Sequence, residues 1–371
     1  MIVKTIESYA KLAQTRLEKY DDDDLVEKLI RKFSAIMMLI FASIFGFTQL
    51  VGNSIKCWCP NEYSGSRCAY AETYCYITNL YVPINNSSHL PRREELQSHK
   101  ILYYQWIPFI FSIQAILFYF PNVVWRILNS KSGFDINGYI EELKNDNSGQ
   151  NDSQGIKFVT HHIETCLLFK KNYQHRGNFK NFVQNRLSIR FFNNGFYLAL
   201  CYFLTKILYL ASIFFQMYIL NNWLIDEHHS SKKNWFFGPH LFNLEDRFPH
   251  MTLCKYEVFI LTDPQLHWLQ CTLPINVYLR KVFLIIYLWL LVLFFLVVVD
   301  IFKFIIFLLN GRKFLASLIR EEKVIEESLD NLSGGLKADG LIVLKLLKSN
   351  TNNFNASAIA TNLYLIEAKK F

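Results

Sequence analysis

Residues 103–125 read YYQWIPFIFSIQAILFYFPNVVW, a stretch of 23 residues without a charged side chain. Because a helix of about 20 residues crosses the hydrocarbon core of a bilayer, this stretch predicts a membrane span. Trp106 and Trp125 mark its two ends, and aromatic rings of this kind favour the membrane–water interface. Pro108 lies in the expected first turn, where its missing N–H costs little, and Pro121 predicts a kink or stop near the end.

Three further apolar stretches predict three more spans. Residues 33–52 carry no charge, and residues 282–299 are apolar throughout and lead on to residue 309. The third span contains Lys206, but the Leu, Ile and Phe residues around it outweigh the insertion cost of one lysine. The chain has 371 residues, of which 51% are hydrophobic and 16% aromatic. We therefore expect an all-α membrane protein with four transmembrane helices.

The distribution of Lys and Arg predicts the orientation. Residues 1–32, 129–195 and 310–371 hold 25 of them in 161 residues, against 11 in the 114 residues of the two other loops. This bias places both termini in the cytoplasm. The formal net charge is +8, but the basic residues form no stripe, so we expect them at a membrane face and expect no nucleic-acid partner.

The spans divide the chain into nine expected segments. These are residues 1–32 as an N-terminal helix and linker, 33–52 as the first span, 53–105 as the first extracellular loop, 106–128 as the second span, 129–195 as a cytoplasmic loop, 196–220 as the third span, 221–281 as the second extracellular loop, 282–309 as the fourth span and 310–371 as a cytoplasmic helical region. In the last segment, residues 312–330 predict an amphipathic helix that Gly334 and Gly335 end, and residues 341–347 predict a short helix or strand.

Most of the cysteines lie on one predicted side of the membrane. Six of the eight fall in the two extracellular loops: Cys57, Cys59, Cys68, Cys75, Cys254 and Cys271. An even set on the oxidising side predicts disulfides rather than a zinc site, although six cysteines allow fifteen pairings. Cys166 and Cys201 are expected to be free thiols. Asn85 and Asn86 offer overlapping glycosylation sequons in the first loop.

A few charged residues near the spans invite a functional interpretation. Asp21–Asp24 lack the spacing of a calcium loop and indicate the start of a helix. Lys206, near mid-span, has three alternatives, since it can face a pore, bond a neighbouring helix or snorkel to the interface. Asp300 and Lys303 are one turn apart, which predicts an interfacial ion pair. We find no catalytic or phosphate-binding motif, so we expect no enzyme, cofactor or metal site, and a channel or a cell-contact protein instead.

Several of these stretches resemble the innexins, the gap-junction proteins of invertebrates. Residues 103–108, YYQWIP, resemble the innexin signature YYQWVP, and residues 118–121 with Trp125 resemble its continuation. Residues 51–58, VGNSIKCW, are similar to the opening of the innexin first loop, with Asn-Ser where the family usually has Asp-Pro. The signature residues in this chain are Tyr103, Tyr104, Gln105, Trp106 and Pro108.

The resemblance implies a large pore in the plasma membrane for passive passage of ions and small molecules. Innexin subunits form half-channels described as octamers, as homo-oligomers or with related subunits, which lie in membrane lipid and dock with a half-channel of the adjacent cell at a gap junction. Two alternatives stay open. One is a non-junctional hemichannel that releases ATP or other solutes, and the other is an adhesion or structural protein without an open pore.

The resemblance also implies roles for individual residues. The N-terminal helix would fold into the pore, so that its first residues line the narrowest point: Met1, Ile2, Val3, Lys4 and Thr5. The innexin pattern joins the two extracellular loops in antiparallel order. That order implies Cys57–Cys271 and Cys75–Cys254, which leaves Cys59 and Cys68 to bridge within the first loop.

Overall fold

The computed structural model describes residues 23–51, 55–78, 80–81, 100–101, 103–145, 153–175, 195–223, 248–260, 263–319 and 326–368. These residues form two compact units. The first, here called the C-terminal unit, comprises Met1–Arg31, Tyr119–Leu210 and Phe295–Phe371. The second, here called the sheet unit, comprises Lys32–Phe118 and Ala211–Phe294.

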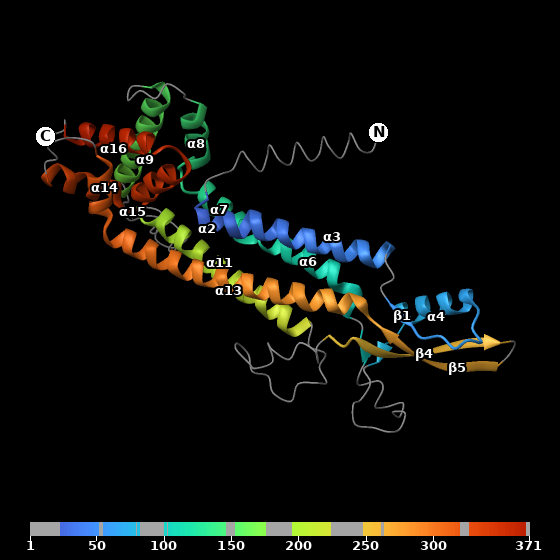
Figure 1. Ribbon diagram of the computed structural model, residues 1–371. Coiled ribbons are helices and arrows are strands. Elements are labelled where there is room, and N and C mark those ends of the chain that lie inside the picture. Colours follow the sequence, from blue (N-terminus) through green and yellow to red (C-terminus); the bar gives the residue numbers. More distant parts are fainter. Residues whose placement is uncertain are drawn as a thin grey trace, which may run out of the picture. The chain divides into compact units, whose positions relative to one another are not determined.

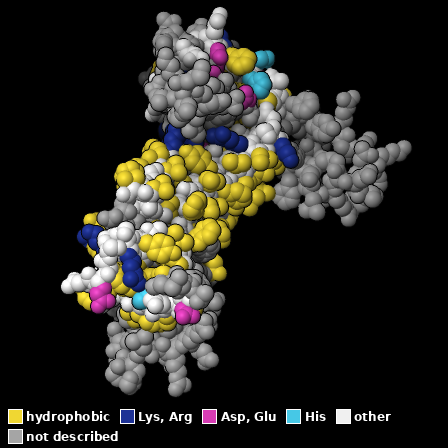
Figure 2. Space-filling view, turned by 90° about the vertical axis from the view of Figure 1, so that its right-hand side faces the viewer, with side chains coloured by type: hydrophobic (Ala, Val, Ile, Leu, Met, Phe, Trp, Pro, Cys, Tyr) yellow, Lys and Arg dark blue, Asp and Glu magenta, His cyan; other side chains and the backbone are white. Residues whose placement is uncertain are grey.

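Among the described residues, four helical stretches are long and apolar enough to cross a membrane, in keeping with the four predicted spans. They are Leu25–Val51, Tyr103–Ser130, Tyr197–Asn221 and Pro274–Leu309. The first and fourth begin eight residues earlier than the charge-free runs suggest, because their helices continue through polar residues such as Glu27 and Arg280. Figure 2 shows hydrophobic side chains gathered closely on the visible face of the long helices. Such side chains suit contact with lipid tails or with another subunit.

The first span begins at the run of acidic residues. It consists of α2 (Leu25–Lys28), the π-helix η1 (Leu29–Ser34) and α3 (Ala35–Val51). Asp24 is the N-cap, and its backbone N–H donates to the carboxylate of Glu27 over 3.0 Å, as in a capping box. The prediction that this run starts a helix is therefore confirmed for its described part.

The second span is interrupted where its second proline predicts a break. After the 3-10 turn η2 (Tyr103–Trp106), α6 (Ile107–Leu117) carries Pro108 in its first turn. The helix stops at Leu117, and α7 (Phe120–Ser130) starts with Pro121 in its first turn. A proline is tolerated at the first turn because that N–H has no intrahelical partner there. The predicted kink is thus present as a break of two residues.

The sheet unit contains a five-stranded antiparallel sheet that the sequence analysis does not predict. The first extracellular loop supplies β1 (Lys56–Cys57), β2 (Leu80–Tyr81) and β3 (Lys100–Ile101), together with helix α4 (Gly65–Ile77). The second supplies the long hairpin β4 (Met251–Ile260) and β5 (Asp263–Thr272). The strand order is β1-β5-β4-β2-β3, so the hairpin lies between strands of the first loop (Figure 1).

The third and fourth spans lie in α11 (Tyr197–Trp223) and α13 (Pro274–Leu309). In the C-terminal unit their inner parts join five further helices. These are α8 (Ile136–Asn145), α9 (Gln154–His175), α14 (Gly311–Leu318), α15 (Glu326–Asn350) and α16 (Asn353–Ala368). They share one hydrophobic core, in which Leu344, Leu346 and Leu347 of α15 are fully buried. The expected cytoplasmic helical region is thus a packed helical assembly.

Two expectations for the C-terminal tail are wrong. The helix predicted over residues 312–330 ends at Leu318, and α15 then runs through Gly334 and Gly335 instead of ending there. The irregularity lies at Lys337, whose φ of 49° is left-handed. Residues 341–347 are helical, which decides between the two alternatives for this stretch. After the glycine pair, Leu336 and the apolar residues of 341–347 are buried in the helical core, and this burial stabilises the helix despite the weak helix propensity of glycine.

Candidate functional site

The two extracellular loops are joined covalently. Disulfides link Cys57 to Cys271 and Cys75 to Cys254, and a third links Cys59 to Cys68. This is the pairing that the family resemblance implies, with the extra pair inside the first loop. Cys166 and Cys201 take part in no disulfide.

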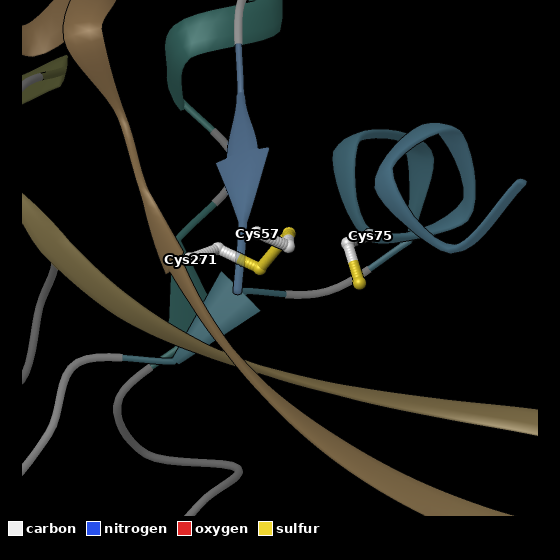
Figure 3. Close-up of side chains that lie close together, drawn as sticks. All are labelled: Cys57, Cys75 and Cys271. Atoms are coloured by element: carbon white, nitrogen blue, oxygen red, sulfur yellow. A yellow bond between two sulfur atoms is a disulfide. The ribbon is translucent and has the colours of Figure 1, made fainter. Parts of the chain in front are cut away.

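The register of the strands brings cysteines of the two loops close together. Cys57 of β1 lies opposite Cys271 of β5, and Leu80 of β2 lies opposite Cys254 of β4. Figure 3 shows the Cys57–Cys271 bond next to the sulfur of Cys75, which projects from α4. These three sulfurs lie within 4.8 Å of one another, but all are in disulfides and offer no thiolate to a metal ion. The arrangement is therefore a cross-linked scaffold.

An aromatic and basic cluster covers the hairpin beside α4. The His267 ring of β5 stacks on Tyr256 of β4, with ring centroids 5.2 Å apart, and meets Tyr63 edge-on at 6.0 Å. The Arg67 guanidinium lies 4.2 Å from the centroid of Tyr63 and its Nη2 is 3.5 Å from Nε2 of His267. The Cys59–Cys68 bond closes the segment that carries Tyr63 and Arg67. This disulfide thus holds the segment before α4 on the first turn of α4, and the Cys75–Cys254 bond joins α4 to the hairpin.

The family signature connects this sheet with two spans. The Tyr104 hydroxyl and the Gln105 amide both donate to the carbonyl of Tyr76, at 2.7 Å each, in the last turn of α4. Gln105 also donates to the carbonyl of Ile77, and the Gln49 amide of the first span donates to the carbonyl of Tyr104. Trp106 is exposed, as a ring at the membrane interface would be. The signature therefore has a structural role in holding α4 on the spans.

In the C-terminal unit, Lys206 is buried in a cluster of carboxylates. Only 1% of its side chain is exposed. Its ammonium lies 3.1 Å from Glu27 and 3.6 Å from Asp24, and it forms an ion pair with Asp300. Of the three alternatives for Lys206, the structure selects the bond to neighbouring helices.

This arrangement corrects the expectation for Asp300. Its carboxylate pairs with Lys206 of α11, 94 residues away in sequence, and not with Lys303 on its own helix. The three carboxylates of Asp24, Glu27 and Asp300 are close enough together to hold a metal ion. The ammonium of Lys206 already lies among them and neutralises part of their charge, so the donor set favours an ion-pair cluster.

The acidic residues before the first span extend the cluster. Asp23 accepts from Nε of Arg31 at 2.6 Å and from the amide of Asn122 at 2.8 Å, and all three are buried. Asp24 accepts from the Tyr202 hydroxyl at 2.7 Å and from Lys345 of α15 at 3.1 Å. Burial alone would raise the pKa of Asp24, but the nearby ammonium groups of Lys345 and Lys206 lower it to about 2. Asp24 therefore stays ionised.

Sequence reasoning missed the partners in this cluster, although one signal was available. A lysine and an aspartate within predicted spans each need a partner of opposite charge, because an unpaired charge is costly there. The run of four aspartates at residues 21–24, which by itself predicts only a helix start, is a candidate source of such a partner. Lys345 gives no such signal, since it follows an apolar run in a cytoplasmic segment.

Some predicted site residues lie outside the described part of the chain. They are Met1, Ile2, Val3, Lys4, Thr5, Asn85 and Asn86. The expected pore lining and glycosylation therefore stay predictions.

Comparison with known proteins agrees with the resemblance. The family model for innexins matches residues 23–366. The chain is 28% identical over 357 residues to Innexin-10 of Caenorhabditis elegans. This alignment covers 88% of the present chain and 62% of Innexin-10. It is 28% identical over 293 residues to Innexin unc-9 (76% and 73%) and 27% identical over 372 residues to Innexin-16 (95% and 92%), both of the same organism. The chain thus spans less than two thirds of the length of Innexin-10 but most of Innexin-16.

Proposed function

The chain belongs to the innexin family, and from that premise we propose that it is a subunit of a gap-junction channel in the plasma membrane. The channel passes ions and small molecules passively between neighbouring cells. One observation carries the proposal beyond family membership. Two disulfides tie the two extracellular loops together into a single sheet on a chain with four candidate membrane spans.

A rigid sheet suits docking to a second half-channel. Docking of flexible loops would cost the conformational entropy of ordering them, whereas a cross-linked sheet is ordered beforehand. Both loops contribute strands to this sheet, so each loop supports the position of the other. We therefore assign the docking role to the sheet of β1 to β5 and to α4.

The assembly around the pore follows the family pattern. We propose that identical subunits, alone or with related subunits, form an octameric half-channel. The exposed apolar side chains of the spans support such an assembly, because they suit lipid on one side and a neighbouring subunit on another. Examples are Leu39, Ile40, Phe47, Phe295 and Phe302.

The pore itself is proposed to be lined by the N-terminal helix and the first span. Met1, Ile2, Val3, Lys4 and Thr5 would then lie nearest the narrowest point. A ring of Lys4 side chains would repel cations and favour anions, since rings of charged side chains set the selectivity of wide pores.

Dye transfer between paired cells tests the proposal. The full chain is expressed in cells that lack junction proteins of their own, and a small fluorescent dye is injected into one cell of a pair. We expect transfer when both cells express the chain and none when only one does, because docking needs a half-channel on each side.

Isolated cells provide the matched comparison. Dye uptake by single cells without transfer between pairs would contradict the junctional role and indicate a non-junctional hemichannel. Cell adhesion that depends on the extracellular loops, with neither transfer, uptake nor conductance, would contradict the channel altogether.

A further inference from the structure

The two ends of α4 are held on the hairpin in different ways. The Cys75–Cys254 bond holds the last turn, whereas side-chain contacts hold the segment before the first turn. In the strand register His267 of β5 lies opposite Tyr256 of β4, and the two rings stack. The ring of Tyr63, just before α4, meets the same imidazole edge-on. His267 is thus a point of contact between this segment and the hairpin.

Nitrogen Nε2 of His267 faces the guanidinium of Arg67. Nη2 of Arg67 lies 3.5 Å from it, within hydrogen-bond distance. A guanidinium donates hydrogen bonds and accepts none, so Nε2 is the acceptor and the imidazole is neutral in this contact. A second proton on the ring would remove the acceptor and place two cations next to each other, which is unfavourable at such a distance.

Arg67 is held beside His267 by contacts of its own. Its guanidinium lies 4.2 Å from the ring centroid of Tyr63, and the face of such a ring attracts a cation. Its backbone N–H donates to Oγ of Ser64, the N-cap of α4, and the next residue, Cys68, forms a disulfide. Repulsion between His267 and Arg67 is therefore passed on to the first turn of α4.

The carboxylates of α4 and of the turn before it are not placed to neutralise a protonated His267. Glu72 of α4 accepts from a backbone N–H of β1 at 3.1 Å and therefore lies toward that strand. Glu62 in the turn, Lys56 of β1 and Asp263 at the tip of the hairpin are exposed. The fields of exposed charges are weakened by water and salt. Arg67 is thus the charge that His267 meets at short range.

The charged pair of β4 lies on the other face of the hairpin. Successive side chains of a strand point to opposite faces, so Lys255 and Glu257 point away from the face that Tyr256 shares with His267. They pair with each other at 3.6 Å. Tyr74 of α4 packs on Tyr256, with ring centroids 6.1 Å apart, and burial raises the pKa of Tyr256, which therefore stays neutral.

From these contacts we propose that His267 and Arg67 are positioning residues of the extracellular sheet, and that protonation of His267 loosens the first turn of α4 and weakens docking in an acidic medium. A histidine side chain ordinarily gains its proton at about pH 6.5. The contact is therefore present at neutral pH and is lost on acidification. The link to docking rests on the proposed function, whereas the positioning does not.

Hydrogen exchange of the purified full-length protein tests the positioning. It is measured at about pH 7.5 and about pH 5.5, on either side of the ordinary histidine pKa. Protection is the intrinsic chemical rate of an amide at each pH divided by its measured rate, so the pH dependence of the chemistry cancels. In the wild type the amides of residues 68–71 should be about 2- to 10-fold less protected at the acidic pH, the effect of losing one ordinary hydrogen bond.

Variants of the pair assign the pH effect. His267→Gln keeps an acceptor for Arg67 that takes up no proton, so protection should be equal at the two pH values. Arg67→Gln removes the cation that opposes protonation and should also abolish the effect, whereas Arg67→Lys keeps the charge and should retain it. His250→Gln is the matched control, because it removes an exposed histidine from the same loop and should leave the effect unchanged.

Dye transfer tests the link to docking. Cells that express the chain are brought together in medium at the same two pH values. The wild type should form at least about 2-fold fewer coupled pairs at the acidic pH, as expected from the loss of one hydrogen bond per subunit. His267→Gln should form equal numbers at both. Other effects of acid on the cells act equally on the two proteins, so the difference between them isolates His267.

Each outcome decides one part. Equal protection of residues 68–71 at the two pH values in the wild type would overturn the positioning, and so would a pH effect that His267→Gln retains. Lower protection in acid, with His267→Gln coupling no better there than the wild type, would overturn the link to docking. A wild type that transfers no dye even at neutral pH would contradict the proposed function and with it that link, and the exchange experiment would still decide the positioning.

Discussion

Lys206 illustrates what a single charge requires in an apolar helix. Its ammonium is almost completely buried and lies among Asp24, Glu27 and Asp300. Burial of a charge is tolerated only where partners of opposite charge and hydrogen bonds replace the lost water. The aromatic ring of Tyr202, with its centroid 4.5 Å from the ammonium, completes the enclosure. Removal of the lysine would leave Glu27 and Asp300 without their cation.

We therefore predict that Lys206→Met destabilises the protein by about 3–5 kcal/mol, the usual cost of breaking a buried pair on one side. Thermal unfolding of the purified protein in detergent measures this effect. Lys206→Arg keeps the positive charge and should therefore lose less stability than Lys206→Met. The control is Lys303→Met, which removes an exposed cation from the helix that carries Asp300. Equal melting temperatures for Lys206→Met and Lys303→Met would contradict the prediction.

At the scale of elements, the sheet owes its order to pairing between distant segments. Strands β1, β2 and β3 have only two residues each, too few to be stable alone, and each pairs with the long hairpin or with a neighbour. The disulfides Cys57–Cys271 and Cys75–Cys254 close sequence separations of 214 and 179 residues. The second bond lies inside the loop that the first one closes. When one of the two bonds is present, the other therefore closes a loop of only 35 residues, the difference between the two separations.

For a closed segment of that size, chain entropy predicts a loss of about 3–5 kcal/mol when the bond is removed. We expect Cys57→Ser and Cys271→Ser to lose stability equally, and the double variant to lose no more than either single variant. Thermal unfolding and dye transfer should both show this pattern. Cys254→Ser is a useful comparison, because combining it with Cys57→Ser removes both bonds between the loops and should cost more. If the double variant lost as much stability as the two single variants together, Cys57 and Cys271 would not be bonded to each other.

In the whole molecule, the two units are stabilised by different kinds of interaction. Covalent bonds hold the extracellular sheet, and ionic contacts hold the N-terminal segment within the C-terminal unit. An ionic contact is weaker than a covalent bond, so the position of the chain at Asp24 depends on the charges of Lys206 and Lys345.

The proposed pore lining leads to a prediction about selectivity. Lys4→Glu replaces a ring of positive charges with a ring of negative charges, so the channel should become more permeable to cations. The reversal potential in asymmetric salt should move toward the equilibrium potential of the cation. Lys313→Glu changes the net charge equally at an exposed position on α14 and should leave the reversal potential in place. A reversal potential that Lys4→Glu does not move would place Lys4 away from the narrowest point.

The sequence by itself determined the four spans, the orientation and the side on which the cysteines gather. These features are local, because a charge-free run, a proline or a cluster of basic residues acts through its own stretch of chain. The break at Pro121 and the helix start at Asp24 were predictable for the same reason. The disulfide pairing came from the family resemblance, since the residues alone allowed every pairing.

The tertiary structure decided which distant groups meet. Asp24 finds Tyr202 and Lys345 at separations of 178 and 321 residues, and Lys206 finds Glu27 at 179. No local pattern encodes such partners, because burial and charge balance are properties of the packed chain. The same holds for the two-residue strands, of which β1 and β2 pair with the β4–β5 hairpin and β3 pairs with β2, and for α15, whose buried residues after the glycine pair stabilise the helix.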